Sequence, residues 1–437
     1  MPSSLILALC FGLAQQPADT ALIITNVNVL PMNDDRVLRG QTVVIERGII
    51  THIGSASYRP TALPSYRLID GTGKYLIPGL VDVHVHFHGN PPSEHPHLLR
   101  MFIANGVTTV VGLRGYPQVL ELRDAVNAGR VLGPRLYTSG PFINEPFFTT
   151  PDEVEREVVA QKRAGYDFIK IHGNLSREAY HRLNEVARRE GIRVVGHAPR
   201  NLGVEVMFQE RQYMIAHGEE FLYDTLSRST DSSLATIESH FAEWARGTAA
   251  ARIWVTPNLT AYKTIGGMVQ NLDSMLARPE VRYLPRSSQV MWGPATNPYT
   301  NRNPPLRAAG IMRRYTLLEK MVLTFHDAHV RLLIGTDAMN TGVVPGWSVH
   351  DELADLVAAG LSPWEALQTA TVNGAEFLGE PGDRGTVAVG QKADLLLLDA
   401  NPFENIVNTR RIAGVMLRGR WFSREEIAGI LGELASN

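Results

Sequence analysis

The 437-residue sequence has a single cysteine, a net charge of only −2 and no long apolar run. One cysteine, Cys10, excludes an internal disulfide framework. The 44 acidic and 42 basic residues nearly balance, so no basic surface indicates nucleic acid as a partner. Because a membrane-spanning helix needs roughly 20 apolar residues, we do not expect an integral membrane protein.

The apolar run at residues 5–14 has the length and position of the core of a secretory signal peptide. Small residues at Gly12 and Ala14 suit cleavage before Gln15, but the run has no preceding lysine or arginine. A loosely packed apolar arm is therefore the alternative. We expect residues 1–19 to be a leader. The protein is then periplasmic or secreted if the leader is cleaved, and otherwise cytoplasmic.

Both ends of the chain show short apolar runs separated by turn residues, a pattern typical of β-hairpins. The pattern covers residues 20–77 and returns over residues 385–437. We expect these two segments to build one small β-sandwich. A capping box at residues 423–426 predicts that a short helix ends the chain.

The middle of the chain, residues 78–384, alternates apolar strand candidates with helical stretches. The strand candidates are residues 80–86, 107–113, 135–139, 168–172, 193–197, 213–217, 253–257 and 331–337. Eight such strands predict an α/β fold of the (β/α)8 TIM barrel type. A doubly wound sheet is the alternative, but no glycine-rich phosphate motif follows the first strand.

A stretch at residues 260–305, rich in Pro, Asn, Arg and Tyr, interrupts the alternation before the last strand. Insertions at this face of a barrel commonly form lids or substrate-binding walls. A surface excursion without a role is the alternative.

Metal-ligand residue types occur where several of these strands end. His84 and His86 are two residues apart on the first strand, so both side chains point to one side. Later strands end in His197, His217 and Asp337. Each residue alone could be structural. Four imidazoles and a carboxylate at one barrel mouth, however, predict a metal site.

These motifs resemble the amidohydrolase superfamily over about residues 20–420. The resemblance rests on PGLVDVHVH at residues 78–86, the two later histidines, GTDA at 335–338, and residues 370–375 and 385–395. FIKIHG and HGEE look most similar to imidazolonepropionase-like proteins and to Xaa-Pro or Xaa-Arg dipeptidases of this fold. The implied chemistry is hydrolysis that depends on divalent metals.

Lys170 and His172 share one face of the fourth strand. An inward lysine is costly as an ammonium ion. The resemblance implies that carbon dioxide carboxylates Lys170 and that the carbamate bridges two metals. A lysine that is ion-paired or reaches the barrel rim is the alternative. Zinc is the first expectation for the metals, although cobalt, manganese or iron would suit the same ligands.

The resemblance further implies a binuclear centre with these ligands: His84, His86, Lys170, His197, His217 and Asp337. A metal-bridging hydroxide would attack the substrate, and Asp337 would act first as base and then as acid. For His172 three roles stay open: contact with the developing oxyanion, substrate binding, or support of a ligand.

We expect hydrolysis of an amide bond in a dipeptide or N-acyl amino acid. Arg114 and Tyr262, after the second and seventh strands, are candidates for binding a substrate carboxylate, although structural roles are equally compatible. The alternatives are a cyclic amidase or lactonase, and an inactive barrel that serves as a binding scaffold. The expected partner is a small molecule, and homo-oligomerisation is left open. His88, His95 and His97 receive no role.

Overall fold

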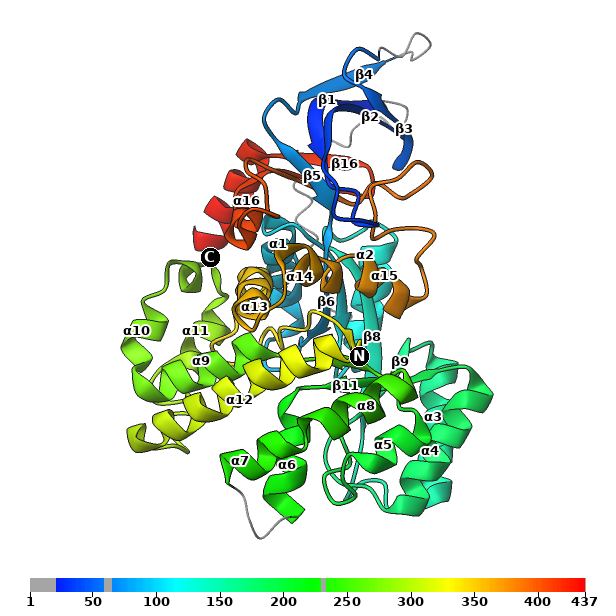
Figure 1. Ribbon diagram of the computed structural model, residues 1–437, viewed down its shortest axis with the longest axis vertical. Coiled ribbons are helices and arrows are strands. Elements are labelled where there is room, and N and C mark those ends of the chain that lie inside the picture. Colours follow the sequence, from blue (N-terminus) through cyan, green and yellow to red (C-terminus); the bar gives the residue numbers. More distant parts are fainter. Residues whose placement is uncertain (1–20, 59–64, 229–232, 437) are drawn as a thin grey trace, which may run out of the picture.

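The computed structural model describes residues 21–58, 65–228 and 233–436, so the expected leader lies outside the described residues. A small sheet forms one end of the molecule, and the larger body below it contains parallel strands surrounded by helices (Figure 1). None of the helices in this described part is long and apolar enough to cross a membrane.

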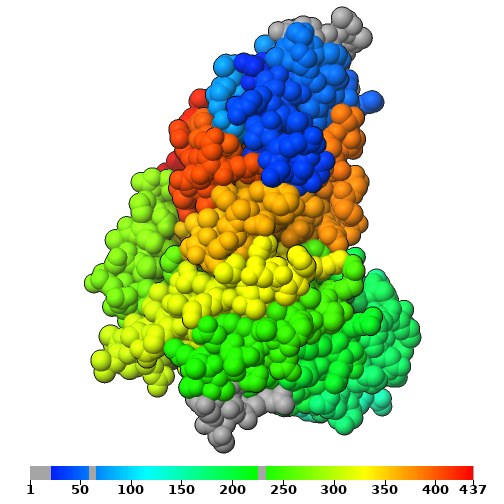
Figure 2. Space-filling model, in the orientation of Figure 1, coloured from blue at the N-terminus to red at the C-terminus, as the bar shows by residue number. Residues whose placement is uncertain are grey.

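The small sheet is built from both ends of the chain. Its order is β16-β15-β14-β5-β1-β2-β3, and β4 also pairs with β1. The N-terminal strands are β1 (Ala21–Val29), β2 (Leu38–Glu46), β3 (Ile49–Ser55), β4 (Tyr66–Asp70) and β5 (Tyr75–Pro78). The C-terminal strands are β14 (Leu395–Leu398), β15 (Ile412–Leu417) and β16 (Arg420–Ser423). Figure 2 shows the two chain ends side by side, with blue next to red and orange.

The two chain ends are joined where β14 runs antiparallel to β5, with Leu396 opposite Ile77. Leu22, Val43, Leu76 and Leu395 belong to one buried apolar cluster over this sheet. The structure thus confirms a separate sheet from both chain ends. Its described strands are joined by hydrogen bonds into one sheet.

Helix starts follow the capping signals of the sequence. The amide of Ser423 donates to the Glu426 carboxylate (2.8 Å), and the Glu426 amide donates to the Ser423 hydroxyl (3.3 Å), at the start of α16 (Arg424–Ser436). Thr150 and Ser362 form complete capping boxes that start α3 (Pro151–Ala164) and α14 (Pro363–Thr369).

The larger sheet has eight parallel strands, and each pairs with the strand that follows it in the sequence. They are β6 (Leu80–Val85), β7 (Val107–Gly112), β8 (Arg135–Ile143), β9 (Phe168–Ile171), β10 (Arg193–Gly196), β11 (Met214–Ala216), β12 (Trp254–Thr256) and β13 (Arg331–Leu332). The eight strands expected from the sequence are therefore present in the expected order. β8 is longer than expected, and β13 is much shorter.

The sheet curls until its edge strands, β6 and β13, approach each other. Val83 donates a backbone hydrogen bond to Ile334 (3.0 Å), and His86 donates one to Ala338 (2.7 Å). Val85 and Ala338 form an isolated parallel bridge. No continuous ladder joins β6 to β13 within the described residues. The barrel expectation is confirmed as a curled, eight-stranded parallel sheet.

Helices cover the outside of this sheet. Those between β6 and β12 are α1 (His95–Ala104), α2 (Pro117–Asn127), α3, α4 (Arg177–Glu190), α5 (Glu205–Glu210), α6 (Glu219–Arg228), α7 (Leu234–Ser239) and α8 (Phe241–Ala251). After β13 come α13 (Trp347–Ala358), α14 and α15 (Val372–Leu378).

The stretch between β12 and β13 is largely helical. It contains α9 (Leu259–Gln270), α10 (Leu272–Leu276), α11 (Arg286–Trp292) and α12 (Ala308–Asp327). The first turn of α9 is anchored by buried Glu352 of α13, whose carboxylate accepts from the amides of Leu259 (2.9 Å) and Thr260 (2.7 Å). Because a helix start leaves its first amides without partners, this carboxylate fixes where α9 begins.

Candidate metal centre

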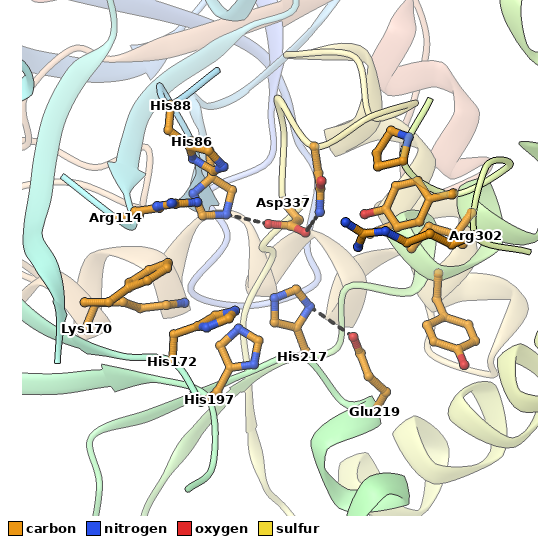
Figure 3. Close-up of a pocket in the computed structure, with 17 residues that line it drawn as sticks. His86, His88, Arg114, Lys170, His172, His197, His217, Glu219, Arg302 and Asp337 are labelled. Carbon is orange, nitrogen blue, oxygen red and sulfur yellow. Dashed lines mark hydrogen bonds and ion pairs between the residues drawn. The ribbon is translucent and has the colours of Figure 1, made fainter. Parts of the chain in front are cut away.

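A cavity of about 760 Å³ opens at the carboxyl ends of the curled parallel strands. Five of the six expected metal ligands line it, namely His86, Lys170, His197, His217 and Asp337 (Figure 3). The sixth, His84, is fully buried and lies against His217, with ring centroids 4.8 Å apart. The structure therefore brings all six residues to one place.

His84, His86 and Asp337 form the tightest group of this site. The Nε2 atom of His86 lies 2.7 Å from Oδ1 of Asp337, and Nε2 of His84 lies 3.3 Å from the same oxygen. One donor atom from each residue lies within 4.8 Å of the others. Two imidazoles and a carboxylate at this spacing are a donor set suited to a divalent cation.

The surroundings of Asp337 keep its side chain an ionised carboxylate, which can bind a cation. Burial alone would raise its pKa, but the neighbouring charges of His217 and His86 outweigh burial and lower it. The side chain of Asn340 donates to Oδ2 of Asp337 (2.6 Å). The backbone of Asp337 has a φ of 65°, which is unusual for a residue with a side chain. Such strain occurs where a site dictates the direction of a side chain.

Asp82 fixes the segment that leads into Asp337. The Thr336 hydroxyl donates to one Asp82 oxygen (2.5 Å), and the Thr336 amide donates to the other (3.0 Å). Burial raises the pKa of Asp82 to about 7. Asp82 therefore links β6 to the segment after β13 that carries Asp337.

Lys170 is 1% exposed, and its Nζ has no hydrogen-bond partner among the described residues. Burial lowers its pKa from 10.5 to about 8. An amine with a lowered pKa is more often neutral, and the neutral amine is the form that reacts with carbon dioxide.

His197 and His217 lie on the other side of Lys170 from β6, with ring centroids 4.7 Å apart. Nδ1 of His197 lies 2.8 Å from Oε1 of Glu220, and Arg200 donates to the same oxygen (2.7 Å). Burial, together with the charge on His217, lowers the pKa of His197. A neutral His197 whose Nδ1–H bonds Glu220 keeps Nε2 available as a ligand.

The unpartnered atoms of the site fit metal ions. Both ring nitrogens of His84, Nδ1 of His86 and Nζ of Lys170 are buried without hydrogen bonds in the described part of the chain. Buried polar atoms are normally satisfied, so a cluster of unsatisfied nitrogens needs an explanation. Bound divalent cations would provide one.

His172 lines the cavity next to the donor group. Its ring stacks on Phe142 with centroids 4.6 Å apart and meets His197 edge-on at 4.4 Å. Burial lowers the pKa of His172 to about 4, so the ring is neutral near pH 7. A neutral imidazole in this position can donate one hydrogen bond to a bound molecule.

Arg114 and Tyr262 both line the cavity, but with different neighbours. The Arg114 guanidinium lies 4.8 Å from the centre of the Phe142 ring. Tyr262, in the first turn of α9, lies beside Arg314 and Tyr223. The two candidate carboxylate-binding residues therefore occupy different parts of the cavity wall.

Five further polar residues that line the cavity were given no role by the sequence prediction: His88, Glu219, Tyr299, Arg302 and Asn340. His88 meets His86 edge-on with ring centroids 4.7 Å apart, and Glu219 lies 3.3 Å from Nδ1 of His217. Tyr299 and Arg302 belong to the stretch at residues 260–305 that was expected to form a wall. That expectation was the only signal that could have found them.

A model of the amidohydrolase family matches residues 75–422. Among solved structures, a bottromycin amidohydrolase is 22% identical with a TM-score of 0.77, and the match covers 96% of this chain and 91% of that one. An Xaa-Pro dipeptidase with bound methionine is 21% identical with a TM-score of 0.70, covering 92% and 100%.

Curated relatives carry other activities. The 5-methylthioadenosine/S-adenosylhomocysteine deaminase of Caldanaerobacter subterraneus is 25% identical over 87% of this chain and 85% of its own length. Adenine deaminase 2 of Desulfotalea psychrophila is 23% identical over 87% of this chain. The chain spans only about half, 54%, of that deaminase.

Proposed function

Because the chain belongs to the amidohydrolase family, we propose that it is a metal-dependent hydrolase of carbon–nitrogen bonds that cleaves dipeptides or N-acyl amino acids. The observation that supports this most is Lys170, a buried amine without a partner in the described structure that lies among four histidines and a carboxylate. An inactive scaffold would have no use for this costly arrangement.

In this proposal the donor residues hold two divalent ions, with zinc the first candidate. His84, His86 and Asp337 would hold one ion, and His197 and His217 the other. Carboxylated Lys170 would contribute an oxygen to each. When bound, such ions polarise a carbonyl oxygen and lower the pKa of a coordinated water to about 7.

The chain's own residues would move the proton. Asp337 accepts a proton from the attacking water, because its lowered pKa keeps it ionised. It then donates that proton to the amine nitrogen as the carbon–nitrogen bond breaks. Asn340 holds the second Asp337 oxygen in place, which keeps the carboxylate aimed at the reacting atoms. His172 would donate a hydrogen bond to the developing oxyanion.

The leaving amine would carry a carboxylate, which Arg114 would bind through its guanidinium fork. Tyr262, on another part of the cavity wall, would contact the rest of the substrate through its hydroxyl. The fold that the chain shares with an Xaa-Pro dipeptidase and a bottromycin amidohydrolase supports an amide substrate. The deaminase relatives favour a purine instead. Lys170 supports the amide substrate, since a bridging lysine would be of no use to a deaminase that holds a single metal.

Two structural proposals accompany this function. The curled sheet would act as a closed (β/α)8 barrel, with residues 334–338 completing the eighth strand. Residues 1–19 would be a leader whose signal peptide, cleaved before Gln15, exports the protein. N-terminal sequencing of protein recovered from the periplasm or the medium tests the second proposal, because an intact Met1 would contradict it.

The test is a hydrolysis screen with zinc and bicarbonate supplied, over dipeptides, N-acyl amino acids, lactones and adenosine. We expect cleavage of amides with a free carboxylate, and slower cleavage of the matching C-terminal amides. Arg114→Ala should reduce this preference by about tenfold or more, the low end for a charged hydrogen bond, because Arg114 is exposed. Tyr262→Phe should lower kcat/KM for the acid and the amide alike. Equal rates for acid and amide in the wild type would remove the carboxylate contact. Cleavage of lactones alone, or release of ammonia from adenosine, would contradict the proposed substrate class.

A further inference from the structure

Two arginines on the cavity wall, Arg114 and Arg302, have guanidinium groups that no acidic side chain of the described residues contacts. Both side chains are exposed and line the cavity, and neither forms an ion pair among the described residues. Arg200, which follows β10, is by contrast paired with Glu220 at 2.7 Å. Two unpaired guanidinium groups that face one cavity are free to bind anions.

The acidic groups of the cavity are already engaged. Asp337 contacts His86 (2.7 Å) and Asn340 (2.6 Å), and Glu219 lies 3.3 Å from His217. The two arginines therefore do not serve to neutralise these carboxylates. The negative charge that neutralises these two guanidinium groups would then come from a bound molecule.

The two arginines face the donor residues from opposite sides. Figure 3 shows Arg114 beside His86 and above Lys170, while Arg302 lies across the cavity, beyond Asp337 and His217. Close neighbours agree with this view. Arg114 lies over the Phe142 ring and Arg302 lies near Tyr299, whose own neighbour is Asp337.

We infer that the substrate carries a carboxylate on each side of the scissile bond, one bound by Arg114 and the other by Arg302. This inference rests on the proposed function and specifies its substrate class. The reacting carbonyl must lie at the donor residues, between the two arginines. The substrate is then an N-acyl amino acid whose acyl group ends in a second acid, as in N-succinyl amino acids or aspartyl and glutamyl dipeptides.

Geometry and size both permit such a molecule. A guanidinium fork matches a carboxylate with two parallel hydrogen bonds. The cavity volume of about 760 Å³ lies within the usual range for small-molecule sites. Arg302 belongs to the segment between α11 and α12, away from the strand ends that supply the donors. Arg302 is therefore a specificity-determining residue and not part of the hydrolytic machinery.

The experiment uses four matched substrates: N-succinyl-L-alanine, its alaninamide, and the two corresponding N-succinamoyl compounds. In each pair a neutral amide of the same shape replaces one carboxylate. The wild type should cleave the diacid with a kcat/KM about tenfold or more above either compound with a single acid. This is the low end for a charged hydrogen bond, because both arginines are solvent-exposed.

The variants separate the two contacts. Arg302→Gln should abolish the preference for succinyl over succinamoyl and keep the preference for acid over alaninamide, with the change mainly in KM. Arg114→Gln should do the reverse. Arg307→Gln removes an exposed arginine outside the cavity and should change neither preference. Two results would overturn the inference: a preference for succinyl over succinamoyl that persists in Arg302→Gln, or wild-type rates that do not depend on the succinyl carboxylate.

The inference and the proposed function can fail separately. Equal rates for the succinyl and succinamoyl compounds, with the acid still preferred over the alaninamide, would retain the proposed function and reject the second carboxylate. If none of the four is cleaved, the proposed function fails for this class, and the same stable compounds can be titrated calorimetrically into the metal-loaded protein. Tighter binding of the diacid that is lost in Arg302→Gln would still support two-sided recognition. Equal binding, or no binding, would reject it.

Discussion

The floor and the rim of the cavity are built differently. On the floor, donor residues at the strand ends are between 0 and 8% exposed, and partners such as Glu220 and Asp82 fix their directions. On the rim, Arg114 and Arg302 are exposed and lack acidic partners within the described structure. Under the proposed function, the floor would set the chemistry and the rim would select the substrate. Changes to the floor should therefore slow every substrate alike.

The largest effect is expected from removing the buried amine of the floor. Lys170→Ala should lose nearly all activity toward every substrate, because the proposed carbamate can then no longer form. Short carboxylates such as formate or acetate should restore part of the rate by occupying the same space. Rates measured with and without added formate check this. Full activity in the variant, or an unmodified Lys170 in the mass spectrum of fully active protein, would reject the carbamate.

Asp337→Asn should have the next largest effect. It should reduce kcat by about 10²–10⁴-fold, the usual contribution of general acid–base catalysis, while much of the metal remains bound. Parallel measurements of kcat and metal content check this prediction. Turnover close to wild type would assign the proton transfer to another group.

Glu220→Gln tests whether a residue that contacts a candidate metal ligand, and not the metal itself, affects metal binding. The change weakens the contact with Nδ1 of His197, so metal affinity should fall by about 10–100-fold. Titration with a competing chelator measures that affinity. Glu210→Gln is the matched control, because it alters a carboxylate–histidine contact with His181 (2.6 Å) on the surface. Equal affinities in the two variants would contradict a supporting role for Glu220.

The smallest expected effect is a pH dependence of the rate at which zinc reactivates the metal-free protein. Burial places the Lys170 pKa at about 8, and only the neutral amine, whose share rises with pH, reacts with carbon dioxide. At a fixed concentration of dissolved carbon dioxide, reactivation of metal-free protein by zinc should accelerate about tenfold per pH unit below 8. It should level off above pH 8. A rate that does not change between pH 6 and 8 would show that carboxylation does not limit reactivation.

The sequence predicted the floor much better than the rim. Strands of alternating or continuous apolar residues give a regular pattern, and that pattern places His84, His197 and His217 at one end of the sheet. The last strand was predicted over residues 331–337 but forms only Arg331–Leu332, since the chain leaves regular pairing to reach the left-handed φ of Asp337.

The rim could not be predicted because its residues do not recur at the regular spacing of a strand or a helix. Arg302 lies between α11 and α12 and reaches the cavity only through the path of that segment. His88 lies just past β6, and its ring reaches the donor group through the local turn of the chain. Which side chains point into the cavity thus depends on backbone turns that residue types alone do not determine.

The most direct test of a binuclear floor is the metal content of the purified protein, measured by mass spectrometry after loading with zinc and bicarbonate. The account predicts about two zinc ions per chain, and about one in His197→Ala or His217→Ala. The exposed surface histidine variant His181→Ala should keep both ions. A stoichiometry near zero, or an unchanged value of two in both ligand variants, would contradict the account.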